Sequence, residues 1–186
     1  MIELWFATPV LYTFAPPLVK KAIEEEYFSK EKDILPTLKK ECWGDNIDAN
    51  YSVTSNLFQE FQLKQLEGYV ANCACGFLEH LNLGVDSLRL DNSWVNYSSK
   101  YNYQNQHSHM PAKISGVYYI KSNEKDGNLK IHSPIRHLPT GSGISSKTVE
   151  YTPQAGKLIM FPSWVEHSVR PNMTDDVRIS VSFNFF

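Results

Sequence analysis

The sequence predicts an α+β fold in which helices precede a mainly β region, arranged as a double-sheet jelly roll with the helices on one outer face. Two observations support this. Residues 1–85 are mixed and contain helical stretches, whereas residues 86–186 contain many short strand-like runs separated by turns. A chain of 186 residues with 42% hydrophobic content suits one core. We therefore expect a single domain, 1–186, with a support region at 1–85 and a jelly-roll core at 86–186.

The first two elements are a short strand and a helix. Residues 4–12 form an apolar run interrupted by Pro9, which suits a strand at the edge of a sheet because proline cannot donate to the hydrogen-bond ladder. Pro16 and Pro17 then precede a predicted helix at about residues 18–29, since proline is tolerated in the first turn of a helix.

A longer helix is predicted from Ser55 or Asn56, either of which can cap its first turn, to a stop at Gly84. Cys73 and Cys75 fall inside this helix. A C-x-C pair can bind metal, but residues i and i+2 of a helix point in different directions. We therefore interpret both cysteines as small, partly buried apolar residues.

The remaining elements are short strands. Turn residues such as those at 126–128, 139–141 and 154–156 separate them. Many short strands with turns between them indicate a sandwich or a barrel. The predicted strands are residues 87–90, 94–97, 114–121, 128–132, 148–151, 157–161 and 178–186.

Charge and cysteine content exclude several classes of protein. The net charge is −2, so no basic excess indicates nucleic-acid binding, and no apolar run is long enough to span a bilayer. The start of the chain lacks the features of a signal peptide. Together with three cysteines, an odd number, this favours reduced thiols in the cytoplasm. The sequence does not decide whether the protein forms a homodimer.

The pair His107 and His109 has a spacing that suits a metal site. Two residues apart on a strand, the side chains point to one face at a separation of roughly 6.7 Å. Neutral imidazoles suit zinc, copper, iron or nickel. His167 follows the apolar run 157–161 and a short turn, which would place it near a strand end at the rim of a pocket.

The other histidines are given ordinary roles. His132 and His137 lie on or after the predicted strand 128–132 and are interpreted as residues of a pocket edge or of the surface. His80 falls in the predicted long helix and is interpreted as structural.

The last predicted strand alternates almost completely. Its apolar set faces one way, and its polar set, which begins with Arg178 and Ser180, faces the other. An exposed polar face is the usual explanation of such a pattern. One charge among small neutral groups also suits the wall of a polar cavity. In that case the Arg178 guanidinium could bind a carboxylate, with the Ser180 hydroxyl adding a bond.

Taken in order, these motifs resemble the 2-oxoglutarate/Fe(II)-dependent oxygenase superfamily. The chain is most similar to its small bacterial and phage members and more distantly similar to prolyl hydroxylases. The match extends over about residues 94–186, and residues 5–10 also look like the start of that subfamily. The segments that carry the resemblance are His107-x-His109, 115–120, 127–131, 156–169 and 178–180.

The resemblance implies a double-stranded β-helix with Fe(II), 2-oxoglutarate and O2 at its site. His107 matches the first metal ligand and His167 the distal one. Arg178 matches the residue that binds the far carboxylate of 2-oxoglutarate, with Ser180 beside it. Tyrosines that contact the cosubstrate in prolyl hydroxylases are matched by Tyr119 and Tyr97. The reaction implied is hydroxylation of a C–H bond, with 2-oxoglutarate converted to succinate and carbon dioxide.

His109 departs from the family pattern H-x-D/E…H, because it stands where the carboxylate ligand is expected. A histidine leaves the full charge of +2 on the metal and shifts its preference towards copper, nickel or zinc. Two interpretations follow. His109 is a ligand in a three-histidine site, which strand geometry favours, or it stays off the metal and leaves room for water, an anion or substrate.

Two other functions stay open. A cupin-like three-histidine metalloenzyme that does not use 2-oxoglutarate would not need Arg178 in the pocket. A non-catalytic jelly-roll binding module would bind no metal. The substrate is not readable from the sequence, although aromatic residues such as Trp43, Tyr101, Tyr103 and Trp164 could line a groove for a peptide or a small molecule.

Overall fold

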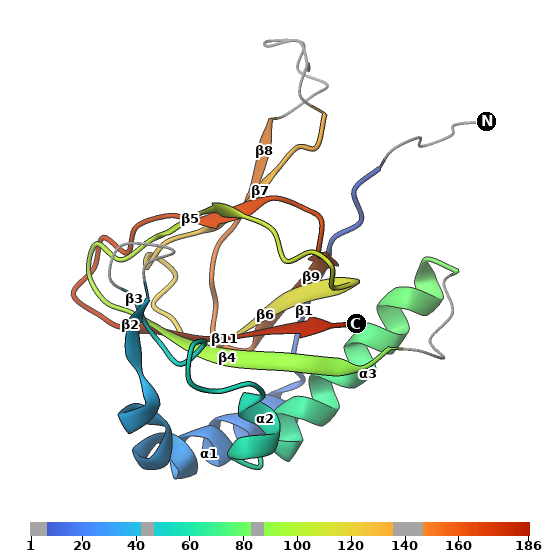
Figure 1. The fold of residues 1–186 in the computed structure, drawn as a ribbon. Coiled ribbons are helices and arrows are strands. Elements are labelled where there is room, and N and C mark those ends of the chain that lie inside the picture. The colour runs from blue at the N-terminus through green and yellow to red at the C-terminus, as the bar shows by residue number, and fades with distance from the viewer. Residues whose placement is uncertain (1–6, 42–46, 83–87, 136–146) are drawn as a thin grey trace.

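Two antiparallel β-sheets face each other, and three helices cover the outer face of the larger sheet (Figure 1). This computed structural model describes residues 7–41, 47–82, 88–135 and 147–186. The helical elements are α1 (Pro17–Ile34), the 3-10 helix η1 (Leu35–Thr37), α2 (Leu57–Glu60) and α3 (Lys64–His80). The strands are β1 (Leu11–Phe14), β2 (Lys39–Glu41), β3 (Ile47–Ala49), β4 (Leu90–Ser98), β5 (Gln104–His107), β6 (Ile114–Lys121), β7 (Leu129–His132), β8 (Thr148–Tyr151), β9 (Lys157–Pro162), β10 (His167–Val169) and β11 (Arg178–Phe185).

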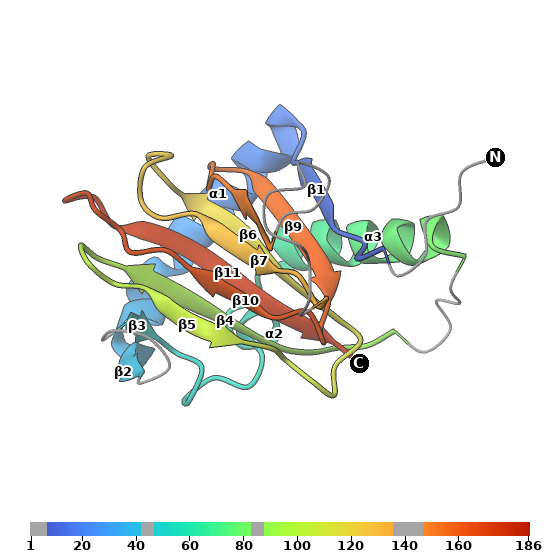
Figure 2. The ribbon, with the colours of Figure 1, turned by 90° about the horizontal axis from the view of Figure 1, so that it is seen from above.

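The strand order is that of a jelly roll. The larger sheet runs β1-β9-β6-β11-β4-β3-β2 and the smaller one β5-β10-β7-β8. From β4 onwards the chain passes back and forth between the sheets, and only β7 and β8 follow each other within one sheet. Figure 2 shows β5, β10 and β7 of the smaller sheet lying over the larger one. The predicted fold class is therefore confirmed.

Strand β11 separates two interiors. Ile179, Val181 and Phe183 belong to the main hydrophobic core, which the larger sheet shares with the helices. Arg178, Ser180 and Ser182 line a pocket on the other face, between the sheets. The period of two along a strand places these sets on opposite faces, so one strand carries both the packing of the fold and the wall of a cavity.

The predicted helices are present with changed bounds. Helix α1 begins at Pro17, as expected, but extends to Ile34. The long helix is broken into α2 and α3 around Gln62, whose φ is 57°. Asn56 caps α2, because its side chain accepts a hydrogen bond from Gln59 N–H at 3.3 Å. Helix α3 ends at His80, earlier than the glycine stop had predicted.

The predicted strands agree with the structure from β6 onwards. The run 94–97 belongs to the longer strand β4, whose polar residues before Trp94 also pair with β11. Of the described residues of the run 87–90, only Leu90 lies in a strand, and that strand is β4. Among the described residues of the run 4–12, only Leu11 and Tyr12 lie in a strand. That strand is β1, which lies at the edge of its sheet as predicted. Strands β2, β3, β5 and β10 were not among the predicted ranges, although His107 and His109 were expected to share a strand.

Some predictions fall outside the described residues. These are residues 4–6, Cys42, Trp43, Gly84, Ser87, His137 and the turn at 139–141.

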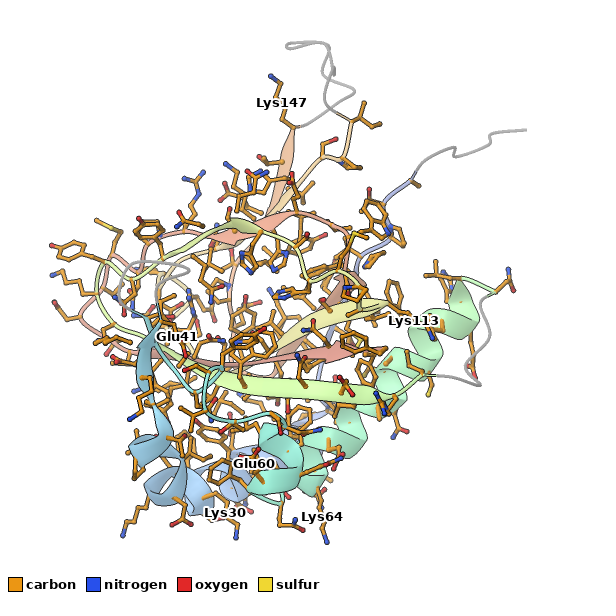
Figure 3. The ribbon with its side chains drawn as sticks, in the orientation of Figure 1. Lys30, Glu41, Glu60, Lys64, Lys113 and Lys147 are labelled. Carbon is orange, nitrogen blue, oxygen red and sulfur yellow. The ribbon has the colours of Figure 1, made fainter. Side chains whose placement is uncertain are left out.

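Lysines extend outwards from both ends of the molecule. Figure 3 shows Lys30 and Lys64 projecting from the helical layer away from the sheets, and Lys147 at the far end of the smaller sheet. Within the described part of the chain, no helix combines the length and the apolar character needed to cross a lipid bilayer.

Candidate functional site

Three histidines converge between the two sheets. His107 is the last residue of β5 and His167 the first residue of β10. They are register partners in the β5–β10 pair, and their ring centroids lie 4.3 Å apart. One ring nitrogen from each of His107, His109 and His167 lies within 4.8 Å of the other two. The structure thus brings the three predicted ligands together.

His109 reaches this cluster by a route that differs from the predicted one. Strand β5 ends at His107, so His109 lies in the following loop and the argument from a shared strand face is wrong. Backbone hydrogen bonds fix the loop instead. His109 N–H donates to the carbonyl of Ser163 at 2.9 Å, and Ala112 N–H donates to the carbonyl of His109 at 3.1 Å. The hydrogen bond to Ser163, in the turn between β9 and β10, therefore positions this imidazole.

Backbone carbonyls orient the rings of His107 and His167. Nδ1 of His107 lies 2.6 Å from the carbonyl oxygen of Asn105, and Nδ1 of His167 lies 3.1 Å from that of Val165. A carbonyl can only accept, so each Nδ1 carries the proton and each Nε2 keeps its lone pair. Metal-binding histidines are commonly oriented in this way.

Burial keeps the imidazoles neutral. Desolvation lowers the pKa of His107 and lowers that of His167 well below its ordinary value. The pKa of His109 is lowered to about 4, mainly by desolvation and further by repulsion from His107. Neutral imidazole is the form that binds a metal, so the cluster is ready for one at neutral pH.

The histidines share a pocket with Arg178, which we call the inner pocket. Among the described residues that line it, Arg178 is the only permanently charged one, and none is aspartate or glutamate. The lining residues are Trp94, Asn96, Gln104, His107, His109, Ser115, Gly116, Val117, Tyr119, Leu129, Phe161, His167, Val169, Arg178, Ser180 and Ser182.

Arg178 is held firmly but keeps one donor unused. Its side chain is buried, and Nη1 donates to the carbonyls of Asp126 and Gly127. Nη2 donates to the hydroxyl of Ser98 at 3.0 Å. Nε is buried and has no hydrogen-bond partner. A buried unpaired donor is costly, which makes the guanidinium a candidate partner for an anion.

Tyr119 and Ser180 complete this side of the inner pocket. They are register partners on β6 and β11, and both are buried. Burial raises the pKa of Tyr119 to about 12, although the charge of Arg178 acts in the opposite direction. The phenol is therefore protonated at neutral pH and can donate a hydrogen bond. Arg178, Ser180 and Tyr119 are thus together, as the sequence predicted.

Tyr97 does not join them, and its predicted position is corrected. Its side chain belongs to the core between the larger sheet and the helices. The Tyr97 hydroxyl lies 2.8 Å from that of Tyr27 and donates to Glu31 at 2.9 Å. Strand alternation explains this, because Trp94 and Asn96 on the same strand line the inner pocket. Tyr97 therefore stabilises the fold and is not placed to contact a cosubstrate.

Trp94, Asn96 and Gln104 are among the residues of the inner pocket that the sequence did not reveal. Asn96 donates to the hydroxyl of Ser182 at 3.1 Å, and the side chain of Gln104 lies 3.5 Å from the amide oxygen of Asn96. The ring of Trp94 packs 5.6 Å from that of His109. The alternation of residues 94–97 contained the signal that could have identified Trp94 and Asn96.

The remaining histidines and cysteines that the structure describes are not part of the cluster. Nε2 of His132 pairs with the hydroxyl of Ser168 at 2.8 Å, and His80 ends helix α3. Cys73 and Cys75 are free thiols, and burial raises the pKa of Cys73. Cys73 is partly buried as predicted, whereas Cys75 is exposed, because residues i and i+2 of a helix point in different directions.

Comparison with known proteins identifies the same fold and family. The family model described as "Putative 2OG-Fe(II) oxygenase" matches residues 92–184, which is half of the chain. No curated protein sequence matches the chain.

Solved structures are similar over nearly the whole chain. A Pseudomonas putida prolyl-4-hydroxylase has 16% identity and a TM-score of 0.65, covering 96% of this chain and 92% of its own. An α-ketoglutarate-dependent epimerase of nogalamycin biosynthesis has 16% identity and a TM-score of 0.67, covering 94% and 77%. A Trichoplax adhaerens prolyl hydroxylase, solved with a peptide of hypoxia inducible factor, has 13% identity and a TM-score of 0.63, covering 96% and 82%.

Proposed function

Because the chain belongs to the 2OG-Fe(II) oxygenase family, we propose that it uses iron(II) and 2-oxoglutarate to hydroxylate a C–H bond of a small-molecule or peptidyl substrate. The observation that carries the proposal is the shared inner pocket. Three imidazoles, each with one ring nitrogen within 4.8 Å of the other two, line the same cavity as an arginine with an unpaired buried donor. The donor set fits a divalent transition metal, and the arginine fits a carboxylate.

The metal would be held by His107, His109 and His167. The carbonyls of Asn105 and Val165 orient two of the three rings, so little rearrangement is required when the ion binds. When bound, the iron and 2-oxoglutarate supply the oxidising chemistry, in which oxygen converts the keto acid to succinate and carbon dioxide and hydroxylates the substrate. All three ligands are neutral, so the ion keeps its charge of +2 for the dicarboxylate to offset.

The cosubstrate's far carboxylate would lie against Arg178. Nε of Arg178 would gain its missing partner, while Ser180 and the protonated phenol of Tyr119 add hydroxyl donors. Arg178 is fixed by the carbonyls of Asp126 and Gly127, so the cosubstrate does not have to order it. Burial of these groups excludes water and strengthens each contact.

A three-histidine metalloenzyme that does not use 2-oxoglutarate is the second candidate. Its supporting observation is the donor set itself, because three neutral nitrogens favour softer ions over iron(II). That candidate leaves the unpaired nitrogen of buried Arg178 without a purpose. A binding module without catalysis leaves both the histidine cluster and the arginine unexplained, so the oxygenase is preferred.

The direct test is anaerobic reconstitution. The protein is loaded with iron(II), 2-oxoglutarate is added under nitrogen, and the visible spectrum is searched for the weak metal-to-ligand charge-transfer band. Oxygen is then admitted and succinate is assayed. We expect the band and slow, substrate-independent formation of succinate. Metal binding without a band and without succinate would favour the second candidate, and no metal binding would favour the binding module.

A further inference from the structure

A second pocket meets the histidine cluster, and we call it the outer pocket. Its volume is about 300 Å³, and the described residues that line it are Tyr51, Trp94, His107, Ser108 and His109. Three of these, Trp94, His107 and His109, also line the inner pocket. Tyr51 and Ser108 are exposed, whereas Trp94 is buried. The outer pocket therefore extends from the protein surface to the proposed metal ligands.

Two aromatic rings form a corner in the outer pocket. The rings of Tyr51 and Trp94 are edge to face, with centroids 4.9 Å apart and planes at 76°. Trp94 also packs with Ile47 and Ala49 of β3, in a small hydrophobic cluster that fixes its position. The corner therefore has one rigid, buried wall and one wall that is 48% exposed. A flat ring could stack on one wall and meet the other with its edge, the geometry that aromatic rings prefer.

The charge of the surroundings favours an uncharged occupant. No lysine, arginine, aspartate or glutamate is among the described residues that line the outer pocket. One carboxylate of 2-oxoglutarate on the metal would leave one positive charge there, because the far carboxylate is offset by Arg178, so a cation placed beside the metal would be repelled. An anion would find no cationic side chain among these residues, and it would compete with 2-oxoglutarate for the metal.

We propose that the outer pocket binds an uncharged, flat ring of the substrate in the corner between Tyr51 and Trp94. The inner pocket is then left to 2-oxoglutarate, and the two ligands meet at His107 and His109. This inference rests on the proposed function, because that function gives the inner pocket to the cosubstrate. Tyr51 is its specificity-determining residue, since it forms the exposed wall.

Three probes of one shape and different charge test the proposal. They are benzamide, benzamidinium and benzoate, which are neutral, cationic and anionic. Each is titrated into cobalt(II)-loaded protein with 2-oxoglutarate under nitrogen, and the paramagnetic relaxation of the probe protons is compared with that in zinc-loaded protein. We expect benzamide to bind beside the metal and benzamidinium to bind at least about tenfold more weakly, because charge repulsion opposes it.

Matched tyrosine variants separate the corner from a general effect. Tyr51→Leu removes the exposed wall, whereas Tyr12→Leu removes another exposed tyrosine, whose ring lies 5.9 Å from that of Tyr151 on the sheet edge. We expect Tyr51→Leu to weaken benzamide binding at least about threefold and Tyr12→Leu to leave it unchanged. Equal affinities in the two variants, or tighter binding of benzamidinium or benzoate than of benzamide, would overturn the proposal.

The two hypotheses fail in different ways. Amide and indole NMR signals of the protein as purified are followed in the same titrations, and they report on the outer pocket without any metal. The protein could fail to bind cobalt and form no succinate, yet still show a benzamide effect that depends on Tyr51. That result would refute the proposed function and support the ring-binding site. Metal binding and succinate formation without a benzamide effect at Tyr51 or Trp94 would refute the ring-binding proposal and leave the proposed function intact.

Discussion

His107 and His167 are register partners across β5 and β10, and each directs Nδ1 to the carbonyl two residues before it in the chain. The same local device thus orients two imidazoles that come from different parts of the sequence. The strand pairing places the two residues opposite each other, and one ring nitrogen of each lies within 4.8 Å of the other and of one from His109. The orientation of the third imidazole, His109, depends instead on its loop, which is held by the backbone hydrogen bond to Ser163.

Removal of His167 should abolish tight metal binding. His167→Ala takes away a buried donor and leaves two, so we expect the affinity for zinc or nickel to fall at least about 100-fold. Isothermal titration calorimetry on the metal-free protein measures it. His132→Ala is the control, since His132 pairs with Ser168 and lies outside the cluster. An equal loss in the control would show that the strand pairing, not the donor, was responsible.

Exchange of His109 for aspartate should change the choice of metal. His109→Asp supplies the carboxylate of the family pattern and lowers the charge of the site by one. We expect the ratio of iron(II) or manganese(II) affinity to copper(II) or nickel(II) affinity to rise at least about tenfold. Competition between metals, followed by elemental analysis, gives the ratio. An unchanged ratio with all affinities retained would indicate that His109 stays off the metal.

Replacement of Arg178 should weaken 2-oxoglutarate and spare the metal. Arg178→Lys keeps the charge but cannot reproduce the fixed guanidinium geometry, so we expect the cosubstrate affinity to fall at least about tenfold. Titration of the charge-transfer band measures it, and zinc affinity should be unchanged. Arg170→Lys is the control, because Arg170 forms an exposed ion pair with Glu150. Normal 2-oxoglutarate binding by Arg178→Lys would contradict the proposed contact.

The metal-free protein should lose stability as the pH falls from about 7 towards 4. Each cluster histidine has a folded-state pKa below its ordinary value of 6.5, so the unfolded chain binds protons first in this range. Protonation then favours unfolding. Thermal unfolding at several pH values measures the effect. His109→Asn removes one titrating group and should flatten the dependence, and an unchanged slope would count against this explanation.

Gly116 should tolerate no side chain. A Cβ there would lie 2.5 Å from the ring of Phe183 and 2.8 Å from the carbonyl oxygen of Ile159. We expect Gly116→Ala to lower the free energy of unfolding by about 1–3 kcal/mol. Gly68→Ala in α3 meets nothing within 4 Å and should raise it by about 0.5–1 kcal/mol. Urea denaturation measures both, and a destabilised Gly68→Ala would contradict the reasoning.

The sequence predicted the parts of the fold whose pattern is strong. Strand β11 alternates almost perfectly, and its two residue sets lie on the two faces that the alternation predicted. Strands β5 and β10 carry no such pattern, because they are short and mix polar residues with the histidines of the site. Their pairing is a long-range contact, which no local pattern reveals.

The two errors at the site also have physical causes. Tyr97 was placed by its resemblance to a tyrosine of prolyl hydroxylases. The alternation along β4 instead gives Trp94 and Asn96 to the inner pocket and Tyr97 to the core. His109 was expected on a strand, but strand β5 ends before it and a hydrogen bond to Ser163 positions it. A loop fixed by a distant backbone carbonyl cannot be predicted from spacing alone.

The two-faced strand β11 has a consequence for how such an enzyme can change. Ile179, Val181 and Phe183 keep the sheet attached to the helices, while Ser180 and Ser182 are directed to the inner pocket. Substitutions at the second set can therefore alter which ligand is accepted without loosening the first set. New specificities can arise one side chain at a time, on a scaffold whose stability is supplied from the opposite side of the same strand.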